Sequence, residues 1–79
     1  MYIKVGTKFR ITETGKQKVV TVISREDAVK RQGEMWVRQM DGPMGHGYIW
    51  VVDDYKNQTR AIHAAWLNQY GHIMPGDET

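Results

Sequence analysis

The sequence predicts a small α+β domain that is mostly β, with about four antiparallel strands closed by one C-terminal helix. Two observations support this prediction. Apolar residues come in short runs up to Tyr55, whereas from Thr59 to Tyr70 they follow a single helical stripe. The chain has 79 residues, the length of one domain with a small core. We therefore expect a single compact domain over residues 1–74 and a short acidic tail over residues 75–79.

The first strand is predicted by alternation with a period of two. One parity is apolar and the other is polar and mostly basic, the apolar set being Ile3, Val5, Phe9 and Ile11 and the polar set Lys4, Lys8, Arg10 and Thr12. The turn Thr14-Gly15-Lys16 then leads into a second strand over residues 18–24. Because this second strand is apolar on both parities, we expect it to be central or bent.

The segment from Ser24 to Gly33 has two interpretations. Ser24 could cap a short helix that Gly33 ends, but only Ala28 and Val29 would give that helix an apolar side. We therefore favour a charged, mobile loop or a single helical turn.

A third strand is expected over residues 34–40, with Met35 and Val37 on one side and Trp36, Arg38 and Met40 on the other. A loop rich in glycine separates it from a fourth strand over residues 48–53, where aromatic and β-branched residues are frequent.

The C-terminal helix is predicted to begin near Asn57 or Thr59 and to end before Gly71. Its apolar stripe is formed by Ile62, Ala65, Trp66 and Tyr70. We expect Trp66 to anchor this helix to the sheet.

Four stretches follow a recognisable order: an apolar strand, an aromatic strand, a short strand with a tryptophan and a helix with a tryptophan. These stretches are 19–25, 34–38, 48–50 and 65–67. The order resembles the chromo domain, and it implies a small SH3-like or chromo-like barrel. In that family an aromatic cage holds a methylated lysine. Trp50 matches one cage position, but another falls near Gln39, which is not aromatic, so only the architecture is carried over.

Several classes of protein are disfavoured by the composition. The chain has no cysteine, and its three histidines match no common zinc spacing, so we expect neither a metal site nor a cofactor. No nucleophile motif or phosphate-binding glycine loop is present, and adjacent Asp53 and Asp54 would point to opposite faces of a strand. We therefore expect a protein that is not an enzyme. No apolar run has the length of a signal peptide or membrane span, and we expect a cytoplasmic protein with no membrane association.

Positive charge is concentrated in the first half of the chain. Residues 1–38 carry nine Lys/Arg against four Asp/Glu, and residues 39–79 carry two against five. The polar parity of the first strand, extended by the following hairpin, is a candidate phosphate-binding face made of Lys4, Lys8, Arg10, Lys16 and Lys18. The alternative is an ordinary solvated face that is kept charged to prevent edge-to-edge aggregation.

Trp36 and Arg38 form a second candidate surface. If both side chains face outward they offer a stacking surface for a base or a contact for a protein. The alternative is that Trp36 belongs to the core, where we also place Trp50 and Trp66.

Two functions remain open. The leading hypothesis is a small non-enzymatic accessory or regulatory protein that binds nucleic acid through the basic strand and the Trp36–Arg38 pair. The alternative is a compact protein-binding module that inhibits or adapts a larger partner, as small phage proteins do. In that case the anchor would be formed by Trp36, Met40, Met44 and His46.

Overall fold

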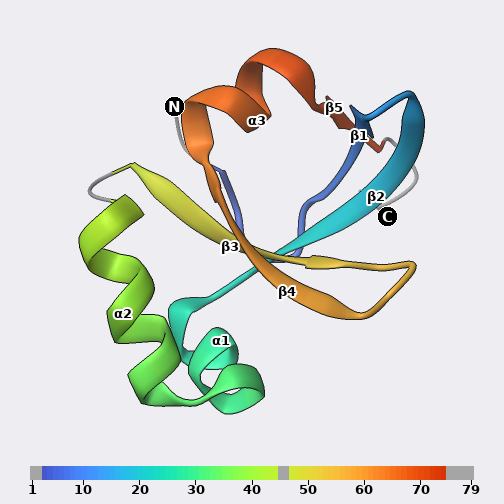
Figure 1. Cartoon of the computed structure of the whole chain (residues 1–79). Helices are drawn as coiled ribbons and strands as arrows, with labels where there is room; N and C mark the ends of the chain where they lie inside the picture. Colours follow the sequence, from blue (N-terminus) through green and yellow to red (C-terminus); the bar gives the residue numbers. More distant parts are fainter. Residues whose placement is uncertain (1–2, 45–46, 75–79) are drawn as a thin grey trace.

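The computed structural model describes residues 3–44 and 47–74 as a five-stranded antiparallel sheet with three helices (Figure 1). The elements are β1 (Lys8–Glu13), β2 (Lys16–Ile23), α1 (Arg25–Gln32), α2 (Glu34–Met44), β3 (Tyr48–Asp53), β4 (Gln58–His63), α3 (Ala64–Tyr70) and β5 (His72–Ile73). The predicted α+β class is confirmed.

The strands lie in the order β4-β3-β2-β1-β5. Two hairpins, β1–β2 and β3–β4, meet where β2 pairs with β3, in a register that places Val22 opposite Val51. β4 and β5 are the two edges and do not pair with each other, so the sheet is open and the predicted closed barrel is not found. None of the described helices combines the length and apolarity that crossing a bilayer requires.

One face of the sheet is covered by α3. The core between them is mostly aliphatic, and Leu67 of the helix is completely buried in it. Its other buried members are Phe9, Ile11, Val20, Val22, Val51 and Ile62, with Trp66 packed at the margin. Leu67, rather than the predicted Trp66, is therefore the fully buried anchor of the helix.

The opposite face is covered by α1 and α2 over β3, β4 and the end of β2 at Ile23 (Figure 1). This second core is aromatic and contains the buried residues Ala28, Val37 and Trp50, with Trp36, Met40 and Tyr48 packed against them. Tyr48 and Arg25 both bind the carboxylate of Asp41, so one charged group joins α1, α2 and β3.

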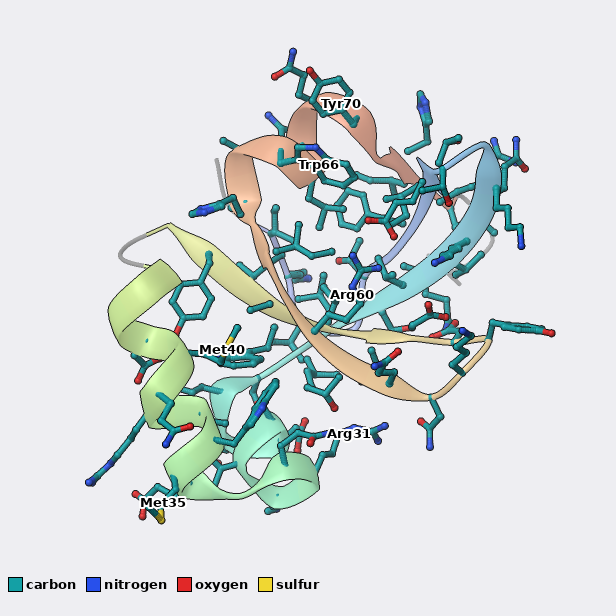
Figure 2. The ribbon with its side chains drawn as sticks, in the orientation of Figure 1. Arg31, Met35, Met40, Arg60, Trp66 and Tyr70 are labelled. Carbon is teal, nitrogen blue, oxygen red and sulfur yellow. The ribbon has the colours of Figure 1, made fainter. Side chains whose placement is uncertain are left out.

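The prediction of a strand over residues 34–40 is wrong, because α2 occupies this stretch. On a helix, Trp36, Val37 and Met40 share one face at i, i+1 and i+4, and this face packs on the sheet. Met35 points away, with 77% of its surface exposed (Figure 2). A short apolar run fits a helix as well as a strand, and only the burial pattern separates them.

The favoured loop between Ser24 and Gly33 is also wrong, and the helical alternative is found as α1. Ser24 caps this helix, since its side-chain oxygen accepts a hydrogen bond from the Asp27 amide at 3.1 Å. At the other end Gly33 has a φ of 95° and donates to the Val29 carbonyl at 2.7 Å.

The predicted C-terminal helix is present only as α3, and the stretch before it is a strand. Asn57 adopts a φ of 54°, which turns the chain back so that β4 pairs with β3 along its whole length. Ile62 is therefore buried from a strand, where it lies opposite Ile49. The sequence predicted a single helix, whereas the part of the chain that the structure describes contains three.

Candidate functional site

The β1–β2 hairpin has one face that neither α3 nor the α1–α2 pair covers. Side chains of alternate residues line it, paired across the strands as Lys8 with Thr21, Arg10 with Val19 and Thr12 with Gln17. Arg10, Thr12 and Gln17 are exposed. We call these six residues the open face.

Lys8 is held at one corner of the open face by two acceptors. Its ammonium group lies 2.8 Å from the Thr21 hydroxyl and 2.8 Å from the Asp54 carboxylate, and the same hydroxyl donates to Asp54 at 2.7 Å. Partial burial of Asp54 would raise its pKa, but the hydrogen bonds from Lys8 and Thr21 lower it below its ordinary value. The charge of Lys8 is therefore largely offset.

The open face continues into a groove at the end of the sheet, where β2 extends beyond β3. Gln17 and Val19 belong to both surfaces. The groove has a volume of about 640 Å³ and is lined by Thr14, Lys16, Gln17, Lys18, Val19, Asp54, Tyr55 and Lys56. We call it the end groove.

The turn that carries Tyr55 is braced from both sides. The Asp53 carboxylate is buried, with 2% of the residue exposed, and accepts hydrogen bonds from the amides of Tyr55 at 2.9 Å and Lys56 at 3.3 Å. Arg31 of α1 donates to the carbonyl and side-chain oxygens of Asn57 at 2.8 and 2.7 Å. The same guanidinium reaches Thr59 of β4 at 2.9 Å (Figure 2). The turn therefore has a fixed shape before any ligand arrives.

A charged bridge crosses the other face of the sheet. Arg60 of β4 donates two hydrogen bonds to Glu13 of β1, at 2.7 and 2.8 Å, and Lys18 lies 3.7 Å from the same carboxylate. The hydrogen bonds from Arg60, followed by its charge, lower the pKa of Glu13. The bridge ties β1 to β4 and offsets part of the charge of Lys18.

The five cations predicted to form one phosphate-binding face are divided by the structure. Lys8 and Arg10 share the open face, but Lys4 precedes a turn in which Gly6 has a φ of 95°. Val5 in this turn is 60% exposed, although the alternation placed it in the core. Lys16 and Lys18 have the opposite parity on β2 and line the end groove.

The Trp36–Arg38 stacking surface is not formed. Trp36 packs in the aromatic core, with its ring centroid 5.6 Å from that of Trp50, while Arg38 is exposed and lies 3.4 Å from Glu34. This is the alternative in which Trp36 belongs to the core. Met40 packs in the same core, and the side chain of Met44 and all of His46 lie outside the described residues.

Sequence reasoning missed the prominent residue of the end groove, Tyr55, which is 87% exposed. The available signal was an aromatic side chain inside the polar run Asp53-Asp54-Tyr55-Lys56-Asn57, where a core residue is not expected.

Within residues 3–44 and 47–74, no three His, Asp or Glu side chains are grouped so as to hold a metal ion. No family model matches the chain, and neither does any curated protein or solved structure.

Proposed function

We propose that this protein is a small non-enzymatic accessory protein that binds nucleic acid through the open face and the end groove. The observation that carries the proposal is the coincidence of an uncovered sheet face with the positive part of the chain. Residues 1–23 hold five Lys/Arg and one Glu, whereas residues 24–79 hold six Lys/Arg and eight Asp/Glu. Charge of this kind on an accessible face attracts phosphates.

Three cations of this surface are available to a ligand. Among the described residues, the charged groups of Arg10, Lys16 and Lys56 form no ion pair and no hydrogen bond, and all three residues are exposed. Lys8 and Lys18 contribute less because each lies beside a carboxylate. About three phosphate contacts give a modest affinity that falls about 20-fold for a single strand between about 50 and 200 mM salt.

The test compares two variants with the same change in net charge. Arg10→Glu combined with Lys16→Glu alters the proposed surface, and Lys30→Glu combined with Arg38→Glu alters exposed cations of α1 and α2. Fluorescence anisotropy with a labelled 12-nucleotide DNA at about 50 mM salt should show that the first pair reduces affinity at least tenfold. The second pair should reduce it about twofold, because long-range attraction is weaker than direct contact.

Equal losses from both pairs would mean that the protein attracts phosphate by its net charge alone and would overturn the proposed surface. The absence of binding by the unaltered protein would overturn the function itself.

A further inference from the structure

We infer that the nucleic acid bound at this surface is single-stranded and that one of its bases stacks on Tyr55. This inference rests on the proposed function and deepens it by naming the ligand. It follows from three properties of the end groove: a bare aromatic ring, its rigid support and the cations around it.

The ring of Tyr55 is unusually bare. At 87% exposure it exceeds the other exposed large apolar residues among those described, which are Met35 at 77%, Val5 at 60%, Ile73 at 59% and Tyr70 at 54%. Leaving an aromatic side chain in water forfeits the burial energy that it would gain in a core. A ligand that covers the ring recovers this energy.

The support of Tyr55 makes it an effective platform. Its amide is bound by the buried Asp53 carboxylate, and Arg31 fixes Asn57 two residues later. Because the backbone of the turn is already ordered, binding does not incur the entropy of ordering it.

The surroundings of Tyr55 fit the backbone of the same ligand. Lys16, Lys18 and Lys56 line the groove beside it. A nucleotide stacked on the ring would thus have its phosphates within a cationic groove, and the strand would continue past Gln17 toward Arg10 on the open face. This combination of aromatic ring and basic groove is typical of proteins that bind single strands.

Duplex nucleic acid fits this arrangement poorly. Its bases are already stacked on one another, so none is free to cover Tyr55 without unstacking. In addition, none of the described helices lies on the open face, so none is placed there to enter a major groove.

The test is a cycle that changes the protein and the ligand separately. The variants are Tyr55→Ala and Tyr55→Phe, with Tyr70→Ala as a matched control, since Tyr70 is an exposed tyrosine on α3. The probes are a 12-nucleotide single strand, the same strand with abasic sites throughout, its duplex and a 12-residue polyglutamate peptide, all at about 50 mM salt.

We expect Tyr55→Ala to weaken single-strand binding about 5- to 150-fold, the range measured for loss of one stacked base. Tyr55→Phe should retain the affinity, and Tyr70→Ala should not change it. The abasic strand should bind the unaltered protein more weakly than the intact strand does, by the same factor. Its affinity for Tyr55→Ala should be no lower than its affinity for the unaltered protein. The duplex should bind less tightly than the single strand and be insensitive to Tyr55→Ala.

Equal binding of the abasic and intact strands, or of Tyr55→Ala and the unaltered protein, would overturn the stacking inference. In that case the proposed function would stand if Arg10→Glu combined with Lys16→Glu still reduced the affinity for the single strand. If polyglutamate bound as tightly as the single strand, both the stacking inference and the proposed function would be overturned, because the surface would then select negative charge and not nucleic acid.

Discussion

β1 and β3 belong to the same sheet but differ in how many of their faces are covered. β1 alternates, with Phe9 and Ile11 buried and Arg10 and Thr12 exposed. β3 has four consecutive buried residues, from Trp50 to Asp53, because α3 covers one of its faces and α1–α2 the other. Helical cover is therefore local, so that β3 is buried on both faces while one face of β1 stays exposed.

The largest effect is expected at Trp50, on the face of β3 under α1 and α2. Trp50→Ala should lower the free energy of unfolding by about 3–5 kcal/mol, the usual cost of truncating a buried aromatic side chain. That is a large share of the stability of so small a domain. Urea unfolding followed by circular dichroism measures it. Trp50→Phe serves as the milder variant. If Trp50→Ala lowered the free energy of unfolding by less than about 1 kcal/mol, the aromatic core would not hold the helices in place.

An intermediate effect is expected from acidification, which acts on the covered face of β1. The pKa of Glu13 is lowered from its ordinary value of 4.5 by Arg60. The bridge therefore stabilises the fold above about pH 4.5, and this contribution is lost as the pH falls through the lowered pKa of the folded state. Unfolding measured between pH 7 and 3 should show a decline that is smaller in Glu13→Gln.

Glu26→Gln on α1 is the control for this decline, since its carboxylate forms no ion pair with another described residue. If both variants follow the same pH profile, the Glu13–Arg60 bridge does not contribute to stability.

The smallest effect on stability is expected on the open face of β1. Arg10→Ala and Thr12→Ala should each change the free energy of unfolding by less than about 0.5 kcal/mol, because both side chains are exposed. Arg10→Ala should nevertheless weaken DNA binding. Thermal unfolding and anisotropy on the same samples compare the two properties, and a destabilisation above about 1 kcal/mol would mean that the open face is structural.

This difference between strands explains which parts of the fold were predictable. The alternation of β1 indicated a strand with one solvent-exposed face, and the aromatic and β-branched residues of β3 indicated a strand. Both strands are found. α2 was missed because its apolar residues fit a strand until one knows that Met35 is exposed and Val37 buried. The stretch that forms β4 was predicted to be helical, because Ile62 fits both the helical period and the strand period. Its pairing with β3 shows that it is a strand.

The candidate site was only partly predictable for a similar reason. Parity alone places Lys8 and Arg10 on one face, since it is a local property of the strand. The bracing of the turn that carries Tyr55 depends in part on Arg31, which lies far away in the sequence and contacts Asn57 from α1. Contacts of this kind leave no periodic signal.

The strand order also bears on how the chain finds its fold. Each hairpin closes over a short turn, at Thr14-Gly15 and at residues 54–57, so each can form from neighbouring segments. The pairing of β2 with β3 instead closes a loop over residues 24–47, which contains both α1 and α2. The central seam of the sheet is thus costlier to close in chain entropy than either hairpin. The helices shorten that loop as they form, so they lower the entropic barrier to folding in addition to covering the finished sheet.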